Sequence, residues 1–408
     1  MKKLLGILAV SAICVLSSAS LVSAAGFALP EQSASAMGMA SAFTAQADDA
    51  SAVWYNPAAM TNLDGTKISG GFVTIYPTFN HENSDGTTDV GKRSFHFPVD
   101  IYATQKIDNR ISLGIGINNP FGLSTNWSQT SKTSQVATVS DVKTYEVNPN
   151  IAYKITDSLS VAVGVAYVKL DASLKNEQNI NPAPPPVILR HSELSGDGDG
   201  WGGNVAALYK ASEKFSTGVS YRSRVKIDID GTAELSGVAK APASTAITLP
   251  DILQWGVSYK ATDKLTVNTD LGYTWWSTYD KIVVTSSTAI FNKTYDKQWK
   301  DVWNLRIGAQ YKLDEALKLR AGLQYDQNPV PDHYFETRVP DSDRVGVSLG
   351  GGYAIGNLTV DVAYLYLKFL TRNINDSVQD DATTSRDSLN GTYKADVHVA
   401  ALNISYRF

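Results

Sequence analysis

The chain lacks several features on which common protein classes depend. It has 408 residues, one cysteine (Cys14) and five histidines, and only 19% of its residues are charged. With one cysteine it cannot close an intramolecular disulfide. Only the first two dozen residues contain an apolar run of helix-spanning length, and mean hydropathy is −0.15, which excludes a helical membrane protein. A net charge of −4 gives no reason to expect nucleic acid as a partner.

Aromatic residues and glycine are plentiful. The chain has 8 Trp, 20 Tyr, 12 Phe and 30 Gly. So many aromatic side chains argue against a disordered chain. Heavy use of Tyr and Thr favours β structure.

The first 24 residues have the pattern of a secretory signal peptide. Lys2 and Lys3 precede an apolar stretch that ends at Ser23, Ala24 and Ala25. We interpret residues 1–24 as a signal that is removed after Ala24, and an uncleaved anchor helix is the alternative. Cys14 lies inside the apolar stretch, where the preceding residues fit a lipoprotein site poorly. The sequence therefore predicts an exported protein.

The body of the chain alternates between apolar and polar residues with period two, as in residues 265–275, 303–311 and 317–325. Such alternation is typical of strands with two different faces, although it does not say whether the apolar face meets a core or lipid. Fourteen strands are expected, at about 66–80, 94–106, 110–122, 139–155, 158–174, 199–211, 214–236, 245–260, 264–287, 297–312, 315–326, 341–355, 358–372 and 392–408.

Short and long connections alternate between these strands. The connections at 107–109, 156–157, 212–213, 261–263, 313–314 and 356–357 are tight, whereas those at 81–93, 123–138, 175–198, 237–244, 288–296, 327–340 and 373–391 are mostly long and polar. An even strand number with this alternation indicates an outer-membrane β-barrel with periplasmic turns and external loops. Aromatic residues near strand ends suit two membrane girdles: Tyr153, Tyr167, Tyr209, Tyr259, Trp275, Tyr311, Tyr325 and Tyr353.

The two ends of the exported chain differ. The last strand alternates up to Phe408, and such an ending resembles the terminal signal that barrel assembly machinery reads. Residues 25–65 are small, Ala-rich and without strand alternation. Because a fourteen-stranded pore is wide, we expect residues 25–65 to fill its lumen as a hatch and residues 66–408 to form the barrel. A tail in the periplasm is the alternative.

Several motifs, in order along the chain, resemble the long-chain fatty acid outer-membrane transporter (FadL/TodX) family. The motifs are Gly26-Phe27, Gly38-Met39-Ala40, residues 47–51, residues 54–60, residues 120–123, Leu249-Pro250-Asp251, residues 256–259, Trp275-Trp276-Ser277, Arg320-Ala321-Gly322, residues 328–332 and residues 340–344. The resemblance implies a monomeric all-β transmembrane protein of the Gram-negative outer membrane, a 14-stranded antiparallel barrel closed by a hatch. It also implies uptake of hydrophobic compounds, with capture in external loops and lateral exit into membrane lipid.

The resemblance implies site residues one by one. Phe27 matches the N-terminal Phe that lines the ligand pocket, and Leu29 is a second ligand-binding candidate. Asn56, Pro57 and Ala58 match the hatch triplet. Gly114, Gly116, Pro120 and Phe121 are the candidates for a lateral opening at an inward kink of the third strand. Segments 175–198 and 373–391 show no family pattern.

Charged residues on the inward face have two interpretations. By alternation Arg306, Arg320 and Asp270 face the lumen, as do Arg222 and Lys318. They can pair with the plug and with one another, which we favour, or with a ligand carboxylate. The Pro-rich run at 182–186 suits an ordinary loop or a stiff lip. Residues 196–200 resemble a calcium loop but lack its ligand spacing, so we expect a turn.

The expected function is uptake of hydrophobic small molecules, with long-chain fatty acids ahead of aromatic hydrocarbons. A general diffusion porin is the alternative from another class, and an outer-membrane hydrolase comes third. The sequence has no G-x-S-x-G elbow, no phosphate-binding glycine loop and no histidines at metal-ligand spacing. We therefore expect no enzyme, no metal and no cofactor.

Overall fold

The computed structural model describes residues 26–181, 188–378 and 389–408. The expected signal peptide, Cys14 and the Pro-rich run at 182–186 lie outside these residues. Within them, none of the helices has the length and apolarity of a membrane span.

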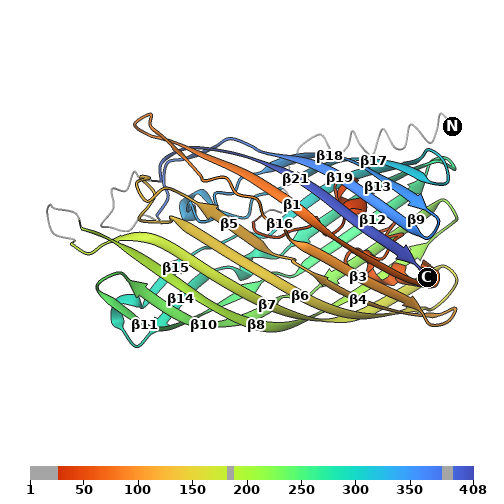
Figure 1. Ribbon diagram of the computed structural model, residues 1–408, viewed down its shortest axis with the longest axis horizontal. Coiled ribbons are helices and arrows are strands. Elements are labelled where there is room, and N and C mark those ends of the chain that lie inside the picture. The colour runs from red at the N-terminus through yellow and green to blue at the C-terminus, as the bar shows by residue number, and fades with distance from the viewer. Residues whose placement is uncertain (1–25, 182–187, 379–388) are drawn as a thin grey trace.

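The strands form one antiparallel sheet that closes on itself, because the first strand pairs with the last, from Lys67↔Arg407 to Asn83↔Gly391 (Figure 1). Closure removes the open edge that lipid cannot satisfy. The barrel wall consists of fourteen antiparallel segments, as predicted. We call each of these segments a stave, because some are a single strand and others are two strands in line. Single strands form the staves β1 (Thr66–Asn83), β3 (Val99–Lys106), β6 (Val139–Lys154), β7 (Leu159–Asn179), β8 (Leu189–Lys210), β17 (Leu317–Asp326), β18 (Arg344–Ile355) and β21 (Gly391–Arg407).

The other staves each consist of two strands in line. They are β4 (Ile111–Asn118) with β5 (Gly122–Asn126), β9 (Phe215–Arg222) with β10 (Val225–Leu235), β11 (Ala239–Leu249) with β12 (Ile252–Lys260), β13 (Leu265–Thr274) with β14 (Lys281–Ser286), β15 (Lys293–Asp296) with β16 (Val302–Lys312), and β19 (Leu358–Phe369) with β20 (Arg372–Ile374). A short strand, β2 (Thr88–Val90), pairs with the far end of β1. The 3-10 turn η2 (Trp276–Thr278) lies between the two strands β13 and β14 of one stave, whereas η3 (Ala289–Phe291) and η4 (Asp332–Tyr334) lie in connections between staves.

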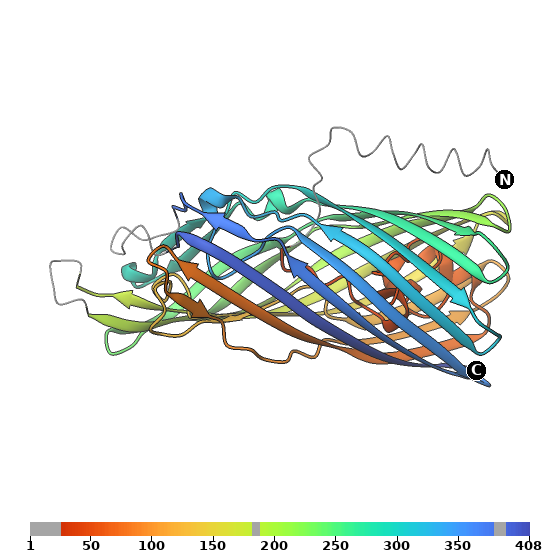
Figure 2. The ribbon, with the colours of Figure 1, turned by 90° about the horizontal axis from the view of Figure 1, so that it is seen from above.

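The outer surface of the barrel carries an apolar band between two aromatic levels. Leu323, Leu349 and Val163 in this band are more than half exposed, as lipid-facing side chains should be. The C-terminus lies at the end of the barrel that has the short turns (Figure 2). Aromatic residues near that end are Tyr153, Tyr209, Tyr259, Tyr311, Tyr353 and Tyr406, and those toward the long-loop end are Tyr145, Tyr167, Trp201, Tyr221, Trp275 and Tyr325.

Two expected loops are instead strands. β7 and β8 pair as far as Asn179↔Leu189, and β10 and β11 as far as Leu235↔Ala239, so most of 175–198 and all of 239–244 belong to hairpins. The expected turn at 196–200 is part of β8. Its glycines permit close strand approach, since a Cβ at Gly198 would lie 2.1 Å from the Asp228 carbonyl oxygen. These segments were predicted as loops because their sequences are polar. They are polar because both faces of these hairpins lie beyond the apolar band, where no side chain has to face lipid.

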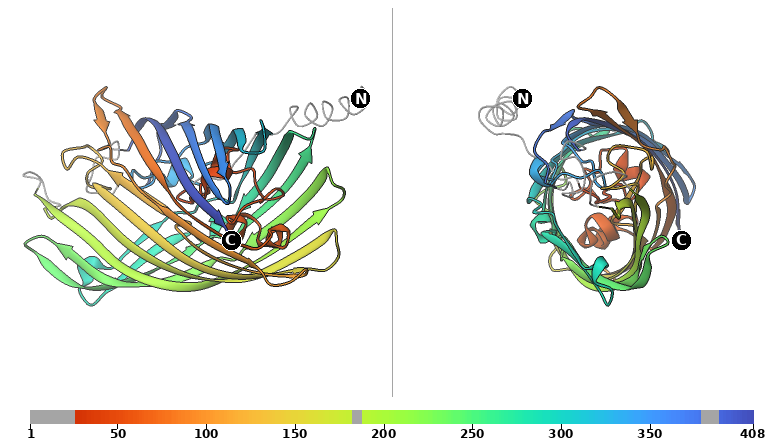
Figure 3. Two further views of the ribbon diagram at one scale, coloured as in Figure 1. Left: turned by 45° about the vertical axis from the view of Figure 1, so that its right-hand side comes forward. Right: turned by 90° about the vertical axis from the view of Figure 1, so that its left-hand side faces the viewer.

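The N-terminal segment (residues 26–63) lies inside the barrel (Figure 3, right). It contains two short helices, α2 (Ala34–Met37) and α3 (Ala52–Tyr55), and the 3-10 helix η1 (Pro57–Asn62). Small side chains let its backbone approach the wall, and α2 contacts β18, β19 and β21 while η1 contacts β6, β7 and β8. Most of its residues are buried, so the segment fills the lumen near the short-turn end.

Candidate functional site

The start of the N-terminal segment adds a short strand to an interruption in the third stave. Between β4 and β5, Pro120 accepts a hydrogen bond from the Leu29 N–H at 2.9 Å. The Gly122 N–H donates to the Phe27 carbonyl oxygen, also at 2.9 Å, and Ala28 bridges Phe121. Because proline has no N–H, Pro120 cannot donate a hydrogen bond to a neighbouring strand. The residues around it form hydrogen bonds with the N-terminal segment instead.

This interruption leaves the barrel wall unpaired on one side. The pairing of β3 with β4 ends at Ile101↔Ile117, and β5 pairs only with β6. The chain before β3, expected to be strand from residue 94, is held to β1 by an isolated bridge between Ile75 and His96. Residues 95–99 and 119–124 therefore face each other across a gap that hydrogen bonds close at its two ends. At one end the Val99 N–H donates to Asn119 Oδ1 at 2.8 Å, and at the other the Lys92 N–H donates to the Asn126 carbonyl oxygen at 2.7 Å.

A cavity of about 530 Å³ extends from this gap into the lumen. Phe95 and Phe97 line its outer end and are each 60% exposed toward the surrounding medium. Phe27, Leu29 and Phe121 line its inner part. Side chains from β1, β19 and β21 complete a mostly apolar wall: Ile75, Phe79, Leu367, Phe369, Val397 and Val399.

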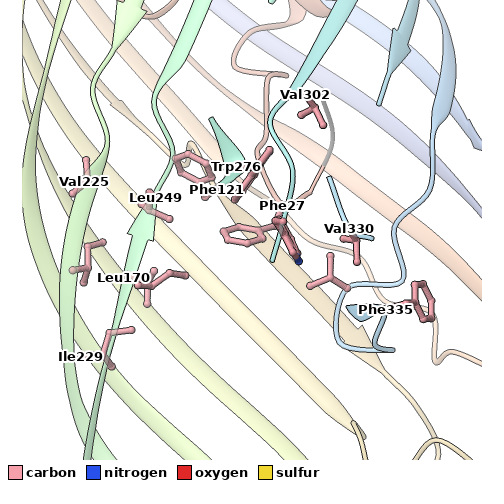
Figure 4. Packing of buried hydrophobic residues seen from close by; sticks show 14 of the residues in the cluster. Phe27, Phe121, Leu170, Val225, Ile229, Leu249, Trp276, Val302, Val330 and Phe335 are labelled. Atoms are coloured by element: carbon pink, nitrogen blue, oxygen red, sulfur yellow. The ribbon is translucent and has the colours of Figure 1, made fainter. Parts of the chain in front are cut away.

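Five aromatic rings meet beside the inner part of the cavity, and Figure 4 labels three of them, Phe27, Phe121 and Trp276. Phe27 lies 4.7 Å from Trp276, 5.7 Å from Trp299, 5.8 Å from Tyr279 and 6.0 Å from Phe121, measured between ring centroids. All four contacts are edge-to-face, the arrangement that ring quadrupoles favour. Phe27 is only 5% exposed, so these neighbouring rings enclose most of its side chain.

Charged groups lie at both ends of the cavity. At the inner end are Glu31, Asp341 and Arg344, and at the mouth Lys143 forms an ion pair with Asp141 at 2.9 Å. Asp341 accepts a hydrogen bond from the Gly26 N–H at 2.6 Å and so fixes the start of the N-terminal segment. Burial raises the pKa of the Asp341 carboxyl to about 6.

The turn at residues 56–58 of the N-terminal segment is tied to the wall by Asn56. Its side-chain amide donates to the carbonyl oxygens of Thr44 at 2.9 Å and Ala207 at 3.1 Å, and its Oδ1 accepts from the Ala58 N–H at 3.1 Å. Pro57 occupies the first position of η1, where its missing N–H costs nothing. Asn56 and Ala58 are fully buried. These three residues thus join the segment to β8.

The inward-facing charges all engage within the lumen. Asp270 Oδ2 accepts from the N–H groups of Phe43 at 3.0 Å and Thr44 at 2.8 Å. Arg306 lies 3.2 Å from Asp326 and also donates to the Ala40 carbonyl oxygen. Arg320 pairs with Asp361 at 2.6 Å, and Arg222 pairs with Glu146 at 3.1 Å. The pairing leaves these side chains little freedom to bind a ligand carboxylate.

Gly114 and Gly116, expected at the lateral opening, lie elsewhere. Both are in the part of β4 that pairs with β3 and β6 on its two sides. They are glycines because the N-terminal segment packs over them: a Cβ at Gly114 would lie 2.3 Å from Met60 Sδ. The interruption is at residues 119–121, which include the other two candidates, Pro120 and Phe121.

Sequence reasoning missed most of the residues that surround Phe27. Trp276, Tyr279 and Trp299 reach Phe27 from staves more than two hundred residues away, and no local pattern announces such a contact. Phe95 and Phe97 were signalled by period-two alternation, which continues through Val99 to Ile101. No cluster of metal-ligating side chains occurs in the described part of the chain.

Comparison with known proteins assigns the chain to a family. The family described as "Outer membrane protein transport protein (OMPP1/FadL/TodX)" matches residues 15–408. The chain belongs to the OMPP1/FadL/TodX family. Outer membrane protein P1 of Haemophilus influenzae is 29% identical over 444 residues, with 94% of this chain and 95% of that protein covered. The long-chain fatty acid transport protein of Salmonella typhi is 26% identical over 406 residues, with coverage of 90% and 93%.

A solved structure shares the fold. A FadL homologue from Pseudomonas aeruginosa superimposes with a TM-score of 0.84 at 19% identity, and 94% of this chain and all of that chain are covered. The OMPP1/FadL/TodX barrel described here is therefore an outer-membrane transport protein of a Gram-negative bacterium. The short-turn end is its periplasmic end, and the long-loop end is external.

Proposed function

We propose that the protein takes up long-chain fatty acids, and that the 530 Å³ cavity beside Phe27 is the site that holds them before release into the membrane. The observation that carries this proposal is the shape of the cavity, which joins the lumen to the lipid-facing gap between residues 95–99 and 119–124. A curated relative named as a long-chain fatty acid transport protein is 26% identical over most of this chain.

The cavity suits an amphipathic chain. Its body is apolar, so each buried methylene of an acyl chain contributes about 0.8 kcal/mol relative to water. A long chain therefore gains several kcal/mol, enough to leave the external medium. Of the cations at the two ends, Arg344 is largely buried and lies 3.4 Å from Asp326, whereas Lys143 is 56% exposed beside Asp141. Lys143 is therefore the cation that a ligand carboxylate can reach.

We propose lateral exit because the gap opens toward lipid. The exposed rings of Phe95 and Phe97 lie at the outer end of the cavity, at the height of the apolar band. A fatty acid that moves past them stays in contact with apolar groups throughout. The break at Pro120 and Phe121 then acts as the lateral opening, and no passage through the water of the periplasm is needed.

The N-terminal segment acts as the hatch in this proposal. Phe27 and Leu29 contact the ligand, and the Asn56-Pro57-Ala58 turn holds the hatch on β8. The filled lumen argues against the general diffusion porin. We further propose cleavage of the signal after Ala24, assembly through the C-terminal Phe408 and a monomeric barrel.

Aromatic hydrocarbons are the second candidate class of substrate. The five rings around Phe27 favour it, because an aromatic ligand can add another edge-to-face contact to the cluster. The two candidates differ in one requirement: a hydrocarbon has no use for the charged groups at the ends of the cavity.

Equilibrium binding to the purified, detergent-solubilised protein tests the proposal. Labelled oleate and labelled toluene are titrated separately into wild type, Phe27→Ala and Phe43→Ala. Phe43 is a matched control, because it is a buried phenylalanine of the same segment that does not line the cavity.

Saturable oleate binding that Phe27→Ala weakens at least tenfold, with Phe43→Ala near wild type, is the expected result. Binding of toluene alone would transfer the assignment to hydrocarbons. Oleate binding that is insensitive to both substitutions would place the ligand outside the cavity and refute the proposed site.

A further inference from the structure

A second gap interrupts the barrel wall, on the external side of the apolar band. β11 and β14 share only two pairs, Ala243↔Ser286 and Ser244↔Thr285. Toward the periplasmic end, the next hydrogen bonds between the two staves come from the Thr278 hydroxyl to the Thr248 carbonyl oxygen and from the Trp275 N–H to the Asp251 carbonyl oxygen. The strand edges between these two closures do not pair with each other.

A cavity of about 550 Å³ occupies this gap. Its rim is polar and carries Asp228, Asp230 and Lys281, whereas Ile229 and Tyr279 lie at its inner end. Tyr221 and Trp275, whose rings lie 6.4 Å apart, mark the aromatic level just below it. The gap therefore opens where lipid headgroups and solvent meet the barrel, not among the acyl chains.

A narrow apolar passage continues inward from this gap. A smaller cavity of about 80 Å³ shares Ile229, Thr245 and Tyr279 with the outer cavity. At its other end the small cavity shares Phe27, Leu123, Val142 and Val339 with the 530 Å³ cavity. Its remaining walls are mostly apolar. The three cavities thus form one series that runs from the β11–β14 gap to the lateral opening.

The neighbouring wall offers no comparable route. β7 and β8 pair as far as Asn179↔Leu189, and Leu235 of β10 lies opposite both Ser192 of β8 and Ala239 of β11. Among the described residues of this part of the external wall, the β11–β14 gap is therefore the break that adjoins the small cavity beside Phe27.

We propose that the gap between β11 and β14 is a side port through which an apolar or amphipathic solute enters from the headgroup level and reaches the Phe27 cavity. The molecule that occupies the port is the transported solute itself. The inference therefore rests on the proposed uptake function and adds the route by which the solute enters. A polar rim suits the headgroup region, and the apolar passage behind it favours partition of the solute inward.

Reversible closure of the port tests this inference. No residue after Cys14 is a cysteine, so introduced pairs are the only thiols of the exported chain. Ala246→Cys with Val283→Cys places two thiols at the first outward-facing positions beyond Ser244↔Thr285 that do not pair. A bis-methanethiosulfonate cross-linker joins them, and a reductant releases them. Uptake of labelled oleate and labelled toluene by cells is measured before linking, after linking and after release.

The matched control is Glu234→Cys with Lys240→Cys, two exposed and directly paired positions of the neighbouring β10–β11 hairpin that line none of these cavities. We expect linking at 246 and 283 to lower the initial uptake rate at least fivefold, reduction to restore it, and linking at 234 and 240 to leave it within twofold. Unchanged uptake with complete linking at 246 and 283, verified by mass spectrometry, would overturn the port.

An accessibility measurement separates the port from the uptake function. In Ile229→Cys, labelling by N-pyrenylmaleimide on intact cells reports access to the inner end of the gap. Ala246→Trp should slow labelling at least fivefold, while Thr232→Trp, on the outer face of β10, should not. If the unlinked variants take up neither ligand, the uptake proposal fails, and this labelling still decides the port. Labelling that Ala246→Trp leaves unchanged would refute it.

Discussion

Removal of the Asp270 carboxylate should release the N-terminal segment from the barrel wall. Asp270 projects from β13 into the lumen, is 1% exposed, and accepts the backbone N–H groups of Phe43 and Thr44. In Asp270→Ala both N–H groups lose their partner in a buried place. Each such orphan costs about 1–3 kcal/mol. We take about 3 kcal/mol for the pair, because the segment can shift and water can enter.

A loss of about 3 kcal/mol corresponds to a roughly hundredfold shift in the docking equilibrium of the segment. The lumen should then open transiently, since the segment fills the barrel near its periplasmic end. Single-channel recording in planar bilayers measures this directly as brief high-conductance events, and the sensitivity of cells to a large hydrophilic antibiotic reports it in vivo. Asp270→Asn keeps one acceptor oxygen and should show a smaller effect.

Asp263→Ala is the control, because Asp263 is an exposed residue of the turn between β12 and β13. It should leave conductance unchanged. If Asp270→Ala folds to a heat-modifiable barrel and yet shows wild-type conductance and antibiotic sensitivity, then the carboxylate does not hold the segment, and the reasoning about its two hydrogen bonds is wrong.

Three further predictions concern packing, a buried ion pair and pH. Gly114→Ala brings a Cβ to 2.3 Å from Met60 Sδ and 2.8 Å from Val53, so it should destabilise the barrel by about 1–3 kcal/mol. The unfolding temperature on a heat-modifiability gel should fall. Gly70→Ala is the control and should keep the wild-type unfolding temperature, because its new Cβ meets only one atom, at 4.0 Å. Lys297→Met removes the nearer partner of Glu336, whose other cation, Arg338, lies 3.7 Å away. Because the side chains of Lys297 and Glu336 are 4% and 6% exposed, the substitution should cost about 3 kcal/mol in urea unfolding followed by tryptophan fluorescence. Lys297→Met with Glu336→Leu should recover most of the loss, and no recovery would contradict the pairing argument. Burial raises the pKa of Asp341 to about 6, so between about pH 4 and pH 6 the docked state keeps a proton that the undocked state loses. Docking of residues 27–29 should therefore weaken as pH rises from about 4 to about 6 and level off above that. Hydrogen exchange of the amides of residues 27–29, corrected for the intrinsic rate, should show this slope in wild type and lose it in Asp341→Asn.

The sequence predicted the barrel well because lipid and lumen impose opposite demands on alternate residues. Within a stave such as β17, the side chain of each residue meets either lipid or the lumen, so period two is visible in the composition. Most strand boundaries in the membrane band were predicted to within a few residues for this reason. The hairpins at 175–198 and 239–244 were missed because outside the membrane neither face has to be apolar.

The candidate site was harder to predict, and the reason is topological. Phe27 could be singled out from a motif, but its neighbours Trp276 and Trp299 come from distant staves that closure of the barrel brings together. The break at Pro120 was visible as a proline in a strand. Its consequence, pairing of 120–122 with the N-terminal segment, depends on a contact across the lumen that no local pattern encodes.

The central claim is that a hydrophobic ligand occupies the cavity between Phe27 and the gap at Phe97. The most direct test is a crystal structure of the protein with 18-bromostearate, with data collected at the bromine absorption edge. The account predicts an anomalous peak inside the cavity, within van der Waals distance of residues such as Phe27, Leu29 or Phe121. Saturating ligand with bromine found only on the lipid-facing surface, and none in the cavity, would contradict it.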